Sequence, residues 1–147
     1  MKKKIFIVIL FVSIMALQGC TAVYEDASDM AAGWKSKVKQ ISVAGLKTMT
    51  DMGENIVIID VRQEGQYSEG NVPGSVNISR GVLEESIGNP EFWAEQYMYP
   101  PEKDSKIIIC SQNGDMGILA AVSLAGIGYK SILNLEGGYE SYLKQQN

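Results

Sequence analysis

The chain has 147 residues, enough for one domain whose core needs neither a metal nor a disulfide, and 46% of them are hydrophobic. Its formal charge is −4, which becomes −7 when the three lysines at positions 2–4 are set aside. An acidic body argues against nucleic acid as a partner. The chain contains no histidine, which excludes Cys-His proteases, Ser-His-Asp hydrolases and imidazole-based zinc sites. We expect neither a metal nor a cofactor.

The first nineteen residues have the pattern of an export signal. Three lysines precede an apolar run over residues 5–17, which is shorter than the roughly 20 residues that cross a bilayer. The run ends in Leu-Gln-Gly-Cys at positions 17–20, which resembles the bacterial lipobox, where the cysteine is lipidated and becomes the new N-terminus. An ordinary signal peptide and an uncleaved anchor are the alternatives. We expect residues 1–19 to be removed and a lipid on Cys20 to hold the protein at the cell membrane or outer membrane, with the domain in the periplasm or extracytoplasmic space.

Residues 20–39 are mixed and polar, and we interpret them as the lipidated cysteine and a tether, with one short helix around residues 30–38. Trp34 either docks on the domain or lies at the lipid interface. A lipidated Cys20 leaves Cys110 as the single free thiol.

From residue 40 the chain alternates predicted strands and helices. Residues 56–59 and 107–109 are short β-branched runs typical of buried parallel strands, and residues 75–78 and 132–135 are weaker candidates. Residues 116–125 predict a largely buried helix, and residues 139–145 a final one. This alternation indicates a parallel α/β sheet covered on both faces.

Cys110 ends one predicted strand, and ligands of such sheets bind beyond the carboxyl ends of the strands. Successive backbone N–H groups and the next helix N-terminus would lower the thiol pKa there and make a nucleophile without a histidine base. Alternatively, Cys110 is a small buried hydrophobe. The candidate substrate loop comprises Ser111, Gln112, Asn113, Gly114, Asp115 and Met116.

Several motifs in order resemble the rhodanese pattern: Asp-Val-Arg at 60–62, Val-Pro-Gly-Ser-Val-Asn-Ile at 72–78, the strand ending in Cys110, and Asn-Leu-Glu-Gly-Gly-Tyr at 134–139. The resemblance covers about residues 40–143, and we assign the domain to 40–147. It implies a rhodanese-like α/β fold with a five-stranded parallel sheet and helices on both faces. It also implies a sulfurtransferase in which Cys110 carries sulfur as a persulfide.

Two loop positions and one upstream position depart from the family pattern. Asn71 replaces a histidine that is usually structural. Asp115 stands where active rhodaneses generally carry an arginine that holds thiosulfate, and a carboxylate there should repel dianionic donors and raise the thiol pKa. Asp115 also suits a helix N-cap. Met116 occupies the place of the oxyanion-clamping arginine of related phosphatases, which argues against phosphatase activity.

Asp60 and Arg62 share one face of a strand end. In the family such residues mostly join the loops around the site, although Arg62 could be the only cation near the thiolate.

Two hypotheses follow. The first is an exported, lipid-anchored sulfurtransferase or sulfur carrier, with polysulfide or a persulfide as donor and a thiophilic acceptor. The second is a catalytically weak or inactive module that binds a protein partner or senses oxidants.

Overall fold

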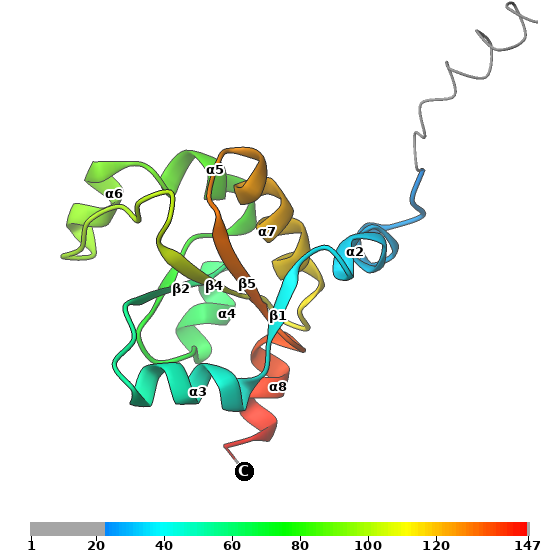
Figure 1. Ribbon diagram of the computed structural model, residues 1–147, viewed down its shortest axis with the longest axis horizontal. Coiled ribbons are helices and arrows are strands. Elements are labelled where there is room, and N and C mark those ends of the chain that lie inside the picture. Colours follow the sequence, from blue (N-terminus) through cyan, green and yellow to red (C-terminus); the bar gives the residue numbers. More distant parts are fainter. Residues whose placement is uncertain (1–22, 147) are drawn as a thin grey trace, which may run out of the picture.

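A computed structural model describes residues 23–146; the predicted signal peptide and Cys20 lie outside the described residues. The elements along the chain are α2 Ala27–Lys35, β1 Lys39–Ile41, α3 Val43–Asp51, β2 Ile56–Asp60, α4 Glu64–Glu69, β3 Ser75–Asn77, the 3-10 helix Arg80–Val82, α5 Leu83–Ser86, α6 Pro90–Glu95, β4 Lys106–Cys110, α7 Asp115–Gly126, β5 Ser131–Leu135 and α8 Gly138–Lys144 (Figure 1).

The five strands form one parallel sheet in the order β1-β5-β4-β2-β3. The four strands expected from the sequence are present, so the predicted fold is confirmed. The additional strand, β1, has only three residues and lies at the edge of the sheet, and its first residue, Lys39, is the last residue of the segment that we interpreted as a tether.

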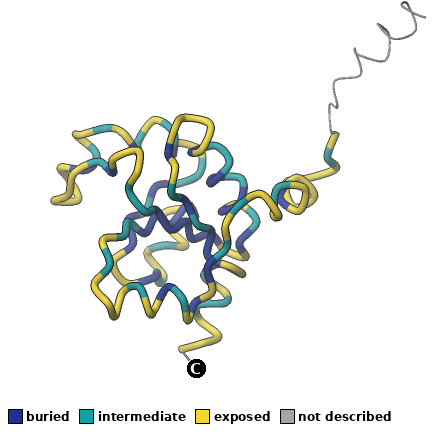
Figure 2. Tube along the Cα trace, viewed as in Figure 1, coloured by how far each residue is buried: buried dark blue, intermediate teal, exposed yellow. Residues whose placement is uncertain are grey.

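Alternate residues of the central strands build two cores on opposite faces of the sheet. Ile107 and Ile109 of β4 pack with α5, α6 and α7, whereas Ile108 and Cys110 pack with α3 and α8. Figure 2 shows the central strands in dark blue, the colour of buried residues. Parallel strands buried on both faces need continuous apolar runs, as residues 107–109 provide.

Helix α2 packs against α7 and belongs to the folded body. The Asp26 side chain caps it by accepting a hydrogen bond from the Asp29 N–H (2.9 Å), and Ala31 is fully buried. The short helix expected around residues 30–38 therefore begins three residues earlier, at Ala27. Among residues 23–146, no helix combines the length and the apolar composition that a membrane span requires.

The docking of α2 can be tested with Ala31→Glu and its exposed neighbour, Ala32→Glu, as control. A carboxylate buried at position 31 without a partner costs several kcal/mol, a cost that α2 avoids by leaving α7. We expect amide hydrogen exchange in α2 to accelerate about tenfold or more in Ala31→Glu, with β4 still protected. Equal exchange in the two variants would contradict this packing.

Candidate active site

Cys110 lies at the carboxyl edge of the sheet, as the last residue of β4. Asp60, the last residue of β2, is its register partner, and the Val61 N–H donates to the Cys110 carbonyl oxygen (2.8 Å). The cysteine has no exposed surface, and it is free of disulfide bonding. Because β2 and β4 are adjacent, the Asp60 carboxylate lies close enough to Cys110 for its charge to act on the thiol.

The Cys110 loop, residues 110–115, is held by its own short contacts. The Gly114 N–H donates to Ser111 Oγ (3.1 Å), and the Asp115 N–H donates to Asn113 Oδ1 (3.2 Å). Gly114 is the N-cap of α7 and has a left-handed φ of 99°, a conformation that favours glycine. The N-cap interpretation of Asp115 was therefore wrong by one residue, since Asp115 is the first residue of the helix.

The start of α8 clamps the Cys110 loop from outside. The Tyr139 and Glu140 N–H groups donate to the Ser111 and Gln112 carbonyl oxygens (2.7 and 3.0 Å). Gly138 has a φ of 58°, and a Cβ on it would overlap the Ser111 carbonyl oxygen and lie 2.8 Å from the Gln112 carbonyl carbon. Sequence reasoning missed this clamp, although the Gly-Gly pair at 137–138 was its signal.

Asp60 and Arg62 form a buried ion pair. Arg62 Nη2 lies 2.7 Å from Asp60 Oδ2, and Arg62 Nε donates to both carboxylate oxygens (3.0 Å each). The same guanidinium donates to the Gly70 carbonyl oxygen (2.8 Å), and its Cζ lies 3.9 Å from the Tyr139 ring centroid. The pair thus joins the end of β2, the end of α4 and the start of α8.

Burial, and after it the Asp60 charge, raise the pKa of the Cys110 thiol to about 12, although the Arg62 charge acts in the opposite direction. The expected lowering of the thiol pKa was wrong for this conformation. The α8 N–H groups donate to loop carbonyls, and the thiol itself faces the Ser111 carbonyl oxygen (3.7 Å). The carboxylate that disfavours the thiolate is Asp60, whereas the sequence pointed to Asp115.

Burial alone would lower the pKa of Arg62, but its hydrogen bonds to Asp60 and the Asp60 charge, with smaller effects of Cys110 and Tyr139, raise the pKa overall. Arg62 is therefore a permanent cation beside the thiol.

Asp115 faces away from the thiol, toward α2. Its Oδ2 accepts hydrogen bonds from Asn113 Nδ2 (3.0 Å) and Ser28 Oγ (2.8 Å). Gln112, whose Nε2 donates to Glu140 Oε1 (3.1 Å), Asn113 and Met116 are exposed, so they form the outer side of the loop. Ser28 comes from the segment interpreted as a tether, and no sequence motif pointed to it.

Within residues 23–146, no three His, Cys, Asp or Glu side chains gather where they could hold a metal ion. The site is thus a buried thiol at a parallel strand end, between an ion pair and a clamped loop.

These features define a parallel α/β domain with a single cysteine at its ligand-binding edge. The rhodanese-like domain family matches residues 42–145, most of the chain, and the protein belongs to this family.

Two relatives and one solved structure illustrate the similarity. Rhodanese-like domain-containing protein 14, chloroplastic, of Arabidopsis thaliana is 29% identical over 126 residues, 62% of this chain but only 56% of that protein's length. Thiosulfate sulfurtransferase GlpE of Pseudoalteromonas translucida is 29% identical over 104 residues, 71% of this chain and 88% of that protein. The human single-domain sulfurtransferase TSTD1 has the same fold, with a TM-score of 0.69, 24% identity, and coverage of 75% of this chain and 99% of that one.

The clamp predicts that Gly138→Ala will destabilise the protein by about 1–3 kcal/mol, because the new Cβ meets the loop backbone and φ stays positive. Gly65→Ala is the matched control, since a Cβ there lies in open space within α4. Denaturant unfolding measures both. Equal stability of the two variants would show that the loop does not need this close approach.

Proposed function

We propose that the protein is a sulfur carrier or sulfurtransferase that forms a persulfide on Cys110. The observation that carries the proposal is a lone thiol at the ligand-binding edge of a rhodanese-like domain, beside the permanent cation Arg62. Members named sulfurtransferases among its relatives support the same reaction class.

The proposed loading step transfers one sulfur atom. The Cys110 sulfur attacks the terminal sulfur of a polysulfide, one S–S bond forms and one breaks, and the thiol proton leaves with the shortened polysulfide: Cys–SH + HSₙ⁻ → Cys–S–SH + HSₙ₋₁⁻. A thiophilic acceptor thiol then removes the outer sulfur and regenerates Cys–SH. Arg62 supports the anionic persulfide, a role that partly replaces the missing loop arginine.

Access to the thiol requires the Cys110 loop to open. Cys110 and Ser111 are buried, and α8 holds the loop by two backbone hydrogen bonds. In the closed loop the thiol stays protonated, so the donor must displace the loop or the start of α8 before attack. Closure afterward would protect the persulfide from other nucleophiles.

Polysulfide or a protein or low-molecular-weight persulfide suits this loop better than thiosulfate. The only charged side chain of residues 111–115 is Asp115, and although it faces α2, its negative charge disfavours the approach of a dianion to the loop. GlpE, a relative, is named for thiosulfate; the carboxylate at position 115 is our reason to propose another donor here.

A second candidate function is a module that binds a protein partner or senses oxidants without turnover. The observation that favours it is the buried thiol with a pKa of about 12, since thiolate is the reactive form. The two candidates differ in whether the Cys110 loop opens to a sulfur donor.

We further propose that the protein is exported and attached to a membrane by a lipid on Cys20. The three lysines, the apolar run and the lipobox-like tetrapeptide support this. The domain would then meet its donor and acceptor outside the cytoplasm.

Intact mass spectrometry of reduced residues 21–147 tests the carrier function. Polysulfide should add about 32 Da, one sulfur atom, and cyanide should remove it; Cys110→Ser should gain nothing. Thiosulfate should give little adduct. A folded protein that takes sulfur from neither donor would favour the binding module.

Asp115→Arg tests the donor proposal. Replacing the negative charge by a positive one should increase the rate of persulfide formation from thiosulfate about tenfold or more, while the rate with polysulfide changes less. Asp51→Arg, on α3, controls for net charge. An unchanged thiosulfate rate would show that Asp115 does not exclude this donor.

The mass of the protein extracted from membranes tests the anchor. We expect a lipidated N-terminal peptide that begins at Cys20, and loss of membrane retention in Cys20→Ser. An unlipidated N-terminus at any other residue would contradict the anchor and leave the proposed chemistry of Cys110 untouched.

A further inference from the structure

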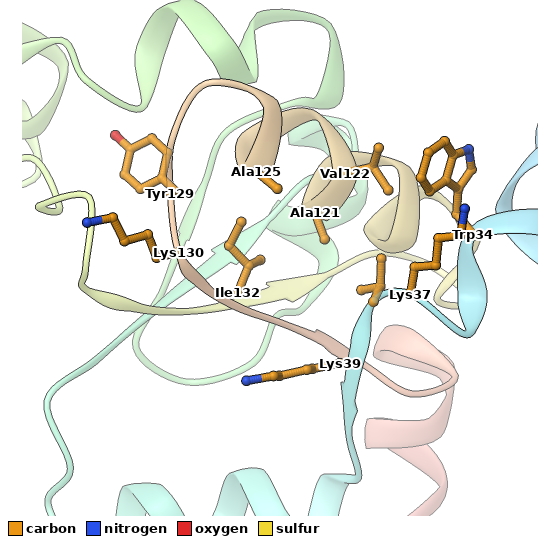
Figure 3. A pocket seen from close by; sticks show the side chains of 10 residues that line it. Trp34, Lys37, Lys39, Ala121, Val122, Ala125, Tyr129, Lys130 and Ile132 are labelled. Atoms are coloured by element: carbon orange, nitrogen blue, oxygen red, sulfur yellow. The ribbon is translucent and has the colours of Figure 1, made fainter.

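A groove of about 430 Å³ lies on the side of the molecule where α2 meets the sheet. It runs between the end of α2, the start of β1, the second half of α7 and the start of β5 (Figure 3). All five strands run in the same direction, and the groove lies where β1 and β5 begin, at the amino ends of the strands. Cys110 ends β4 and therefore lies at the carboxyl ends of the strands, on the opposite side of the sheet. Nothing in the sulfur chemistry uses it.

The groove combines an apolar floor with a basic rim. Ala121, Val122 and Ile132 contribute to the floor, and Lys37, Lys39 and Lys130 are the charged residues that line it among residues 23–146. We name it the lysine groove. All three lysines are exposed. Their concentration is notable in a chain whose charge beyond residue 4 is −7.

Two aromatic side chains lie at opposite ends of the lysine groove, Trp34 at one and Tyr129 at the other (Figure 3). Lys37 Nζ lies 4.6 Å from the Trp34 ring centroid, and Lys103 Nζ lies 3.9 Å from the Tyr129 ring centroid. Trp34 is partly exposed, unlike the fully buried Trp93. A tryptophan beside lysines over an apolar floor is the composition that favours a membrane interface.

We propose that the lysine groove is a docking surface for the anionic phospholipid headgroups of the membrane that holds the chain, an inference that rests on the proposed membrane attachment. The lysine ammonium groups pair with lipid phosphates, and Trp34 enters the interface. The catalytic edge then stays away from the lipid, open to soluble donor and acceptor.

The position of the chain end supports this occupant. Cys20 lies seven residues before the start of α2, a length that spans at most about 25 Å when extended. Helix α2 has nine residues, about 14 Å along its axis. A bilayer that holds the chain at residue 20 therefore lies within reach of Trp34 at the far end of the helix.

A second copy of the chain fits the lysine groove less well. In a symmetric dimer the three lysines of one protomer would face those of the other. Lys39 also lies on the edge strand β1, where a lysine opposes pairing with another strand. The charge therefore points to an anionic surface.

Trp34 fluorescence in proteoliposomes provides the test. The full-length chain is reconstituted in vesicles of phosphatidylcholine alone or with phosphatidylglycerol, each with and without brominated acyl chains. The measured quantity is the quenching ratio between brominated and unbrominated vesicles, and Trp34→Phe gives the background from buried Trp93. The triple variant Lys37→Gln, Lys39→Gln, Lys130→Gln is compared with the control Lys47→Gln, Lys144→Gln, which changes lysines of α3 and α8.

We expect strong quenching only with phosphatidylglycerol, loss of it in 1 M salt, and retention in the control variant. Each lysine should change the ratio of docked to undocked chains about fivefold, so the triple variant should lose quenching. Equal quenching in both lipids, or in the triple variant, would overturn the proposal. So would a salt-resistant dimer in detergent that Val122→Glu, which adds a charge to the floor of the groove, abolishes, because that result would assign the groove to a second copy. The mass of the protein extracted from membranes shows whether Cys20 is lipidated. A lipidated protein whose Trp34 is not quenched would therefore contradict the docking and leave the anchor standing.

Discussion

The buried ion pair between Asp60 and Arg62 is the interaction on which the site depends. Asp60 is the register neighbour of Cys110, and Arg62 contacts the Gly70 carbonyl oxygen and the Tyr139 ring, so one pair connects the thiol with three separate segments. Removing either partner leaves an uncompensated charge in the core, which typically costs about 3–5 kcal/mol. Asp60 and Arg62 therefore both set the electrostatic surroundings of the thiol and stabilise the folded domain.

The pair also determines the resting chemistry of Cys110. Asp60 and burial favour the protonated thiol, and Arg62 opposes them. An isolated thiolate in the core would be costly, whereas the persulfide of the proposed reaction would form with the loop open and would meet a cation already in place. The tight approach of Gly138 to the loop gives the closed state its geometry. A neutral thiol and a permanent cation beside it are the two features that the proposed carrier function requires of the closed loop.

The sequence predicts those parts of the protein that depend on local pattern. The apolar runs at 56–59 and 107–109 identify the central strands, and the parallel arrangement then places Cys110 at the ligand-binding edge. The sequence does not reveal β1, because a strand of three residues is too short to show a periodic pattern. It also does not reveal that α2 packs against α7, because Ala31 is the one residue of this helix that is buried. The sequence also indicates Asp115 as the carboxylate that raises the thiol pKa. In the fold Asp115 faces Ser28, while Asp60 lies beside Cys110 through strand pairing, a relation that sequence distance conceals.

The most direct test of this account is a pH titration of Cys110 by NMR, with ¹³Cβ-labelled cysteine in residues 21–147, where Cys110 is the only cysteine. The pKa of a thiol buried beside Asp60 lies near 12, so the Cβ shift should stay that of a protonated thiol through pH 9 and begin to move only above it. In Asp60→Asn the pKa should fall, because one of its two causes is gone. A wild-type thiol that ionises at or below its ordinary value of about 8.5 would contradict the central claim that burial and the ion pair govern this site.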